Sequence, residues 1–241
     1  MAAPLRAVLT DIEGTTTSIS FVYDVLFPYA AARLEKACRT AEAHAAVERL
    51  RAEYQEEERE TARVGKKDGA EPLPDFGDGV PYARYLMGLD RKSTGLKALQ
   101  GLIWEEGYRS GEIQGHVFED VPPALRRWRD TGLRLRVFSS GSIQAQKLLF
   151  GHSEAGDLTP LFEGYHDTTT GPKQEASSYR AIAEAYGLKA GEILFLSDVR
   201  GELDAAKAAG MRTGMLVRPG NRPAEPGPHA TYASFAEIEV A

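Results

Sequence analysis

Short apolar runs alternate with amphipathic stretches along this chain. The runs have the composition of buried strands, and they lie at residues 6–10, 133–140, 161–168, 192–199 and 213–220. Apolar positions recur at helical spacing over residues 120–131, 142–151, 173–188 and 202–210. Strands that alternate with helices of about 10–15 residues are typical of right-handed βαβ units. The pattern therefore predicts an α/β protein built on a parallel sheet.

A helical insert separates the first predicted strand from the others by about a hundred residues. Helical spacing runs through residues 30–64 and again through 81–109, and a loop rich in Gly, Pro and Asp joins them at 65–80. We therefore predict a Rossmann-like core with a helical domain inserted after its first strand. The expected core is residues 1–18 and 122–241, and the expected insert is residues 19–121.

Composition narrows the class of protein. The chain has 241 residues, 42% of them hydrophobic, which is enough for a substantial core and excludes global disorder. A net charge of −6 argues against a nucleic-acid partner. Neither a secretory signal nor a membrane-length apolar run is present, and the single Cys38 suits a reducing compartment. We expect a cytoplasmic protein with no membrane partner.

Polar side chains gather where the predicted strands end. They are Asp11 and Glu13 after the first strand, Ser139, Ser140 and Gly141 after the second, Lys173 before the helix that follows the third, and Asp198 and Glu202 after the fourth. Ligands of open parallel sheets bind outside the carboxyl ends of the strands, so these four segments should converge. Carboxylates with backbone carbonyls suit Mg²⁺, and hydroxyls and amides at a helix start suit a phosphate. The set predicts a phosphoryl-transfer site.

The same motifs carry a family resemblance. DIEGTT, SSG, the lone Lys173 and LSDVRGELDAA resemble, in order and spacing, the four motifs of the haloacid dehalogenase-like phosphatases. Longer segments, among them LTDIEGTTTSISFVYDVLFPYA and VFSSGSIQAQKLLFGHSEAGDL, resemble the enolase-phosphatases of methionine salvage. This resemblance extends from about Leu9 to Asn221, which is nearly the whole chain.

The resemblance implies a role for each residue. Asp11 matches the nucleophile that also binds Mg²⁺, and Asp198 matches the second metal carboxylate. Glu13 stands where other phosphatases of the superfamily carry an aspartate as general acid/base, and its position also offers a backbone carbonyl to the metal. The loop that binds the substrate matches Ser139, Ser140 and Gly141. Lys173 matches the lysine that holds phosphate and nucleophile together. Glu202 matches an acidic residue that orders metal-bound water.

The implied reaction has two parts. A 2,3-diketo-5-methylthiopentyl-1-phosphate is enolised, and its phosphate is then hydrolysed through an aspartyl-phosphate to release an acireductone. Glu13 is either the enolisation base or a residue that orients the metal site. The family implies one Mg²⁺ per subunit, a small phosphorylated substrate and a monomer.

The sequence leaves open the role of four apolar residues near the ends of the insert and the substrate of the enzyme. The insert should act as a cap, in which Phe21, Leu26, Trp104 and Tyr108 either line the methylthio pocket or pack in the core. The main alternative activity is a Mg²⁺-dependent phosphatase of another small metabolite. A metal-free dehalogenase fits the acidic residues less well, and a silent binding module would lack the nucleophile or the lysine. His44 and His229 are expected at the surface.

Overall fold

The computed structural model describes residues 3–64, 71–91, 93–223 and 225–240, and the chain divides into two compact units. One unit comprises Met1–Asp24 and Gln114–Ala241, and the other comprises Val25–Ile113. The sequence placed its divisions at 18/19 and 121/122, several residues from these boundaries. Residues 65–70 of the expected loop lie outside the described part, and residues 71–79 contain neither helix nor strand.

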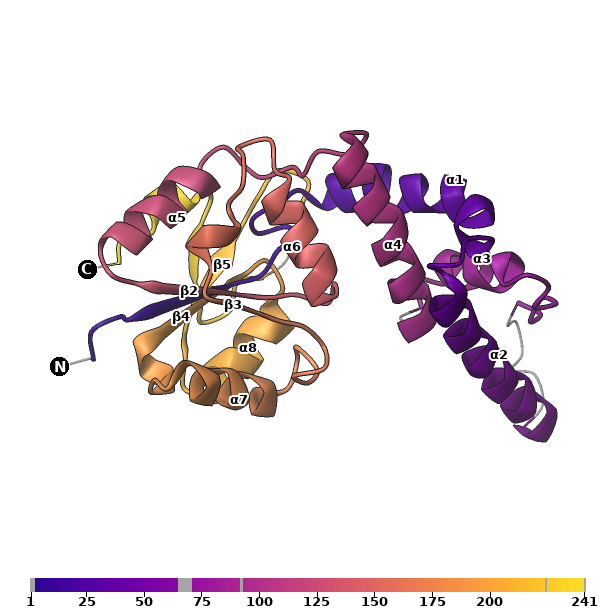
Figure 1. Cartoon of the computed structure of the whole chain (residues 1–241). Coiled ribbons are helices and arrows are strands. Elements are labelled where there is room, and N and C mark those ends of the chain that lie inside the picture. The colour runs from indigo at the N-terminus through magenta and orange to yellow at the C-terminus, as the bar shows by residue number, and fades with distance from the viewer. Residues whose placement is uncertain (1–2, 65–70, 92, 224, 241) are drawn as a thin grey trace. The chain divides into compact units, whose positions relative to one another are not determined.

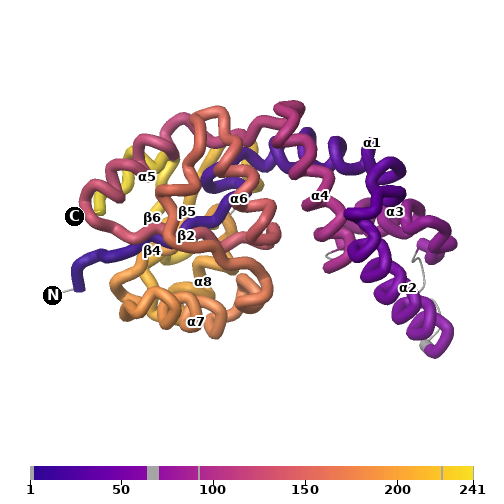
Figure 2. The backbone as a smooth tube through the Cα atoms, viewed as in Figure 1, coloured from indigo at the N-terminus to yellow at the C-terminus, as the bar shows by residue number. Residues whose placement is uncertain are grey.

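The first unit is built on a six-stranded sheet in the order β3-β2-β1-β4-β5-β6, with every neighbouring pair parallel. The strands are β1 (Ala7–Thr10), β2 (Arg134–Phe138), β3 (Gly164–His166), β4 (Ile193–Ser197), β5 (Arg212–Leu216) and β6 (Ala230–Tyr232). The tube in Figure 2 shows β1, in indigo, running between β2 and β4. The predicted parallel α/β sheet is confirmed, but β6 was not predicted.

Helices cover both faces of this sheet (Figure 1). They are α5 (Val121–Asp130) and α6 (Ile143–Gly151) on one face, and α7 (Ala176–Tyr186) and α8 (Arg200–Ala208) on the other. Short 3-10 turns lie at Thr159–Leu161, Ala190–Glu192 and Phe235–Glu237. The Ser142 hydroxyl caps α6 by accepting the Ala145 N–H at 3.2 Å, and Gly187 ends α7 at φ 66°. Local sequence thus sets the start of α6 and the end of α7.

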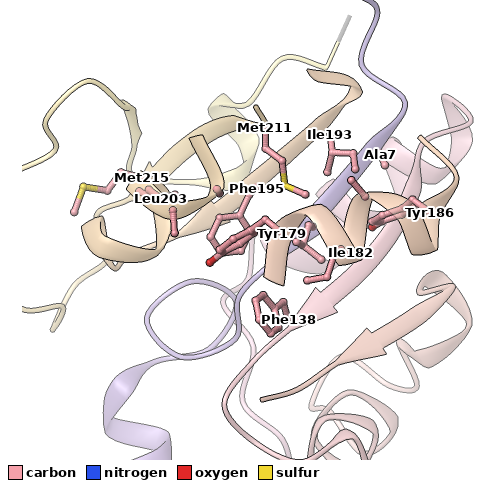
Figure 3. Packing of buried hydrophobic residues seen from close by; sticks show 14 residues of the cluster. Ala7, Phe138, Tyr179, Ile182, Tyr186, Ile193, Phe195, Leu203, Met211 and Met215 are labelled. Carbon is pink, nitrogen blue, oxygen red and sulfur yellow. The ribbon is translucent and has the colours of Figure 1, made fainter. Parts of the chain in front are cut away.

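The core between the sheet and helices α7 and α8 is rich in aromatic residues (Figure 3). Tyr179 packs edge-on against Phe138 and also contacts Phe195, with ring centroids 5.5 Å and 5.0 Å apart. Each such buried ring stabilises the fold by about 1.5–3 kcal/mol. The buried Tyr179 hydroxyl donates to the Lys173 carbonyl oxygen at 2.7 Å. Core packing therefore also fixes the backbone of a predicted site residue.

The second unit is helical. After a π-helical turn at Phe21–Leu26, which crosses the boundary, it contains α1 (Phe27–Cys38), α2 (His44–Val64), α3 (Val80–Gly88) and α4 (Thr94–Ser110). Each of the two predicted long helical stretches is therefore interrupted. At the second interruption Asp90 has φ 49°, and the Ser93 hydroxyl caps α4 by accepting the Leu96 N–H at 3.0 Å. No helix in the described residues is both long and apolar enough to span a bilayer.

The four apolar residues considered for a methylthio pocket are all buried, as core packing requires. Phe21, Leu26, Trp104 and Tyr108 each expose less than a tenth of their surface. Within the helical unit, the Trp104 indole N–H donates to the Leu26 carbonyl oxygen at 2.9 Å. A buried tryptophan with its one donor satisfied is typical of a structural residue.

Candidate active site

The nucleophile position lies at the carboxyl end of the central strand. The Asp11 N–H donates to the Leu196 carbonyl oxygen at 2.9 Å, which continues the β1–β4 pairing by one residue. A tight turn follows, in which the N–H groups of residues 15, 16 and 17 all donate to the Ile12 carbonyl oxygen. Gly14 has φ 69°, and a Cβ there would lie 2.3 Å from Asp198 Oδ2. Only glycine permits this turn beside the Asp198 carboxylate.

Lys173 joins two acidic residues from different elements, Asp11 directly after β1 and Glu202 in the first turn of α8. Its Nζ lies 2.7 Å from Asp11 Oδ1 and 2.7 Å from Glu202 Oε2, and its side chain is 7% exposed. Burial by itself would lower the Lys173 pKa, but the two carboxylates outweigh it and hold that pKa above its usual value. The lysine is therefore a fixed positive charge beside Asp11.

Glu202, expected to order metal-bound water, makes two contacts in this structure. Its Oε2 lies beside Lys173 Nζ and also accepts the Ser197 hydroxyl at 3.0 Å. Burial and the nearby Asp11 carboxylate raise the pKa of Glu202 to about 7. The sequence places Ser197 with Asp198 at the end of the fourth predicted strand but gives it no role. Its signal was its position as the last residue of β4, level with Asp11 in the β1–β4 register.

Asp198 has the properties of a cation ligand. Its Oδ1 is buried with no hydrogen-bond partner. Burial and the Asp11 carboxylate raise the pKa of Asp198 to about 7. An unpaired buried carboxylate oxygen near a second carboxylate is costly unless a cation neutralises it. The Asp11 and Asp198 carboxylates fit a divalent cation that takes its remaining ligands from backbone and water. Within the described residues, no group of three His, Cys, Asp or Glu side chains converges as a metal site.

The loop after β2 lies at the neighbouring strand end. Thr10 is level with Val137, so Ser139 follows β2 about where Asp11 follows β1. The Ser139 N–H donates to the His166 carbonyl oxygen at 3.1 Å, and the Ser139 hydroxyl accepts the Gly141 N–H at 3.2 Å. Ser140 lies between them, half-buried. The loop has a defined shape at the start of α6, which suits an anion.

Glu13 lies in the turn itself. It is half-buried and forms an isolated parallel bridge with Thr17. The structure thus joins Asp11, Lys173 and Glu202 by direct contacts and sets Asp198 against the turn, while Glu13 and the loop at 139–141 lie on the same edge of the sheet.

Several residues that sequence reasoning did not single out support this edge. Asn221 and Arg218 reach carbonyl oxygens of the turn at residues 14 and 15. Only a short polar run after β5 marked them in the sequence. His229, expected at the surface, is buried; its ring nitrogens contact Thr213 Oγ1 at 2.7 Å and Asp204 Oδ1 at 3.0 Å. This prediction was wrong because β6 brings the C-terminal segment against β5 and α8.

A parallel α/β core that joins an aspartate, a lysine and further carboxylates at its strand ends defines a class of hydrolases. Residues 5–210 match the family model of haloacid dehalogenase-like hydrolases. The chain belongs to this family. Among solved structures, it resembles the Unknown transcript 4 protein of Saccharomyces cerevisiae with a TM-score of 0.77 and 33% identity over 97% of this chain and 100% of that one. The phosphate complex of CbbY from Rhodobacter sphaeroides shares the fold, with a TM-score of 0.61 and 19% identity over 97% of this chain and 96% of that chain.

Curated relatives narrow the family further. The chain is 52% identical to Enolase-phosphatase E1 of Pseudomonas aeruginosa over 98% of this chain and 99% of that protein. It is 51% identical to Enolase-phosphatase E1 of Azotobacter vinelandii, with 99% of both chains covered. Within the haloacid dehalogenase-like hydrolases, this chain is a member of the enolase-phosphatases of methionine salvage.

Proposed function

We propose that this site enolises a 2,3-diketo-5-methylthiopentyl-1-phosphate and then hydrolyses its phosphate, with Asp11 as the nucleophile. The observation that carries the assignment of residues is the contact of Lys173 Nζ with Asp11 Oδ1 at 2.7 Å in a buried setting. A carboxylate and a phosphate repel each other, so a fixed cation beside the attacking oxygen is what this chemistry requires.

The phosphoryl step follows from these groups. An Asp11 carboxylate oxygen attacks phosphorus, the bond from phosphorus to the substrate oxygen breaks, and that oxygen leaves with a proton as the acireductone. Water then attacks phosphorus of the aspartyl-phosphate, which releases inorganic phosphate and restores Asp11. Lys173 offsets the negative charge throughout, and the hydroxyls and N–H groups of Ser139, Ser140 and Gly141 hold the phosphate oxygens.

The enolisation step needs a base. The proton leaves the carbon that bears the phosphate ester, which the adjacent ketone makes acidic, and passes to the base. The carbonyl oxygen takes a separate proton from solvent and becomes the enol hydroxyl. We assign the base to the Glu13 carboxylate, two residues after the nucleophile and only half-buried. The same residue would then return the proton to the leaving oxygen. The alternative is that Glu13 only orients the site.

Asp11, Asp198 and the Glu13 backbone carbonyl would hold one Mg²⁺ per subunit. When bound, the ion supplies positive charge for the phosphate and for the two carboxylates. The unpartnered Asp198 Oδ1 and the raised pKa of Asp198 support this assignment. Glu202 acts through its contact with Lys173, which it keeps charged and aimed at Asp11.

The remaining assignments are broader. We assign the helical insert, residues 19–121 by sequence, the role of a cap that excludes water from the reaction. We also assign the protein to the cytoplasm as a monomer. The connectivity supports the cap, because the insert interrupts the core directly after the turn that carries Glu13.

Anaerobic turnover of the 2,3-diketo phosphate with Mg²⁺ tests the function. Enol absorbance and phosphate release are followed together, and Asp11→Asn should abolish phosphate release. Glu13→Gln should abolish both signals; full enolisation with loss of hydrolysis alone would reassign the base. Release of phosphate from many simple esters, with no enol and no preference for the diketone, would leave a general phosphatase and refute the proposal.

A further inference from the structure

The backbone of the turn after Asp11 is held by donors from distant parts of the chain. The Gly14 carbonyl oxygen accepts Asn221 Nδ2 at 2.9 Å, and the Thr15 carbonyl oxygen accepts Arg218 Nε at 3.2 Å. The Thr16 carbonyl oxygen accepts the Phe118 N–H at 3.0 Å. Three successive carbonyl groups are therefore fixed from outside the turn.

Arg218 is the centre of this arrangement. Its side chain is 3% exposed, and its two terminal nitrogens pair with the two carboxylate oxygens of Asp120, each at 2.9 Å. Nη1 also donates to the Ala233 carbonyl oxygen at 3.0 Å, and the guanidinium carbon lies 4.4 Å from the centre of the Phe118 ring. All five donor hydrogens of a guanidinium lie in one plane, so these partners fix its orientation.

Asp120 is itself held in place. Its Oδ2 accepts the Phe235 N–H at 2.6 Å, so the carboxylate bridges the guanidinium and the C-terminal segment. A buried ion pair adds little net stability against apolar groups of equal volume, because both charges must be desolvated. A buried arginine that pairs with Asp120 and donates its Nε–H to the active-site turn is better explained by the position that it imposes on that turn.

We propose that Arg218, oriented by Asp120, is a positioning residue that fixes the turn after Asp11 and thereby the direction of the catalytic carboxylates. The proposal rests on the function proposed above. Two contacts link the position of the turn to the positions of Asp11 and Asp198. The Thr16 hydroxyl donates to the Asp11 carbonyl oxygen at 3.3 Å, and Gly14 abuts the Asp198 carboxylate. A displacement of about 1 Å at a reacting group is enough to lower a rate about a hundredfold.

The test compares two arginines that each bond a carboxylate and a main-chain carbonyl, Arg218 at 3% exposure and Arg134 at 34%. Arg218→Met removes every donor and keeps the length of the side chain. Arg134→Met is the matched control, since Arg134 also pairs with a carboxylate, Glu163 at 2.8 Å, and with a main-chain carbonyl, Tyr186 at 2.5 Å. Arg134 begins β2, at the opposite end of the strands from Asp11. Steady-state kinetics with the diketo phosphate and Mg²⁺ are combined with hydrogen exchange of the amides at residues 15–17.

We expect Arg218→Met to lower kcat at least tenfold, to change KM less than threefold, and to speed exchange at residues 15–17. Arg134→Met should leave kcat within twofold and that exchange unchanged. Arg218→Lys should not restore kcat, because one ammonium cannot bond the turn and both Asp120 oxygens. If Arg218→Met does not fold, Asp120→Asn, which keeps the shape and removes the charge, should show the same pattern in weaker form.

Two results would overturn the proposal. One is a folded Arg218→Met, or Asp120→Asn in its place, with kcat within twofold of the parent. The other is an equal loss of kcat in Arg134→Met, which would indicate general destabilisation. An inactive parent chain would instead refute the proposed function, and the exchange comparison would still decide whether Arg218 orders the turn.

Discussion

Removal of the buried Lys173 ammonium should change both stability and activity, and the stability change should depend on pH. In Lys173→Met the Asp11 and Glu202 carboxylates lose a cation that lies 2.7 Å from each. Loss of one partner of a buried ion pair costs about 3–5 kcal/mol when the other stays charged. The cost falls when the carboxylates can bind protons instead.

The pKa of Glu202 determines whether the stability loss of Lys173→Met grows or shrinks with pH. Burial and Asp11 raise this pKa from an ordinary value of 4.5 to about 7. A carboxyl group whose pKa is raised by folding contributes stability at low pH, and that stability is lost as pH rises from about 4.5 through about 7. At about 1.4 kcal/mol per tenfold change in proton affinity, the rise corresponds to about 3 kcal/mol. Without Lys173 the pKa rises further, so the deficit of the variant must grow with pH.

Urea unfolding in EDTA measures this. We expect Lys173→Met to lose about 3–5 kcal/mol at pH 8 and less than about 2 kcal/mol at pH 5.5. The double variant Lys173→Met/Glu202→Gln should recover about 1–3 kcal/mol at pH 8, because glutamine removes an unpaired buried charge. Lys207→Met, at an exposed lysine on α8, should stay within about 0.5 kcal/mol of the parent at both values.

Activity supplies a second readout. With Mg²⁺ present, Lys173→Met should lower kcat for phosphate release about 100- to 1000-fold, which is typical for loss of one group that stabilises transition-state charge. A stability deficit of equal size at pH 5.5 and pH 8, or a double variant no more stable than Lys173→Met, would show that the buried carboxylates do not carry the cost.

Two further predictions concern other buried groups. At pH values above 7 and in EDTA, Asp198→Asn should have a higher thermal unfolding temperature than the parent. The substitution removes a carboxylate whose pKa is raised to about 7 by burial and by Asp11. Activity with Mg²⁺ should be lost, and an unchanged unfolding temperature would contradict the reasoning. His229→Ala should lower the free energy of unfolding in urea by about 1–3 kcal/mol, because the buried ring contacts Asp204 and Thr213. The kcat should stay within twofold of the parent. A large loss of kcat would show that this ring contributes to the reaction.

The parallel sheet could be predicted because its signals are local. Apolar runs of strand length alternate with helical spacing, and β1 is buried at all four positions, as a central parallel strand must be. The convergence of polar residues follows from the same pattern, since parallel strands bring their carboxyl ends to one edge. The roles assigned to these residues stay predictions until variants are measured.

Other features left no local signal. The β6 strand is short and largely exposed, and it exists because β5 offers a free edge. At the break between α3 and α4, Asp90 has φ 49° and Ser93 caps α4, and helical spacing reveals neither feature. The burial of His229 follows from β6 and could not be predicted without it.

By itself, the sequence determined the class of fold, the insertion after the first strand and the types of chemical group at the site, because periodicity and residue type are written along the chain. Only the tertiary structure decided that Lys173 bridges Asp11 and Glu202, and that Arg218 holds the turn after Asp11 from 203 residues away. These contacts join segments far apart in sequence, and their energies depend on burial and distance, which exist only once the chain has folded.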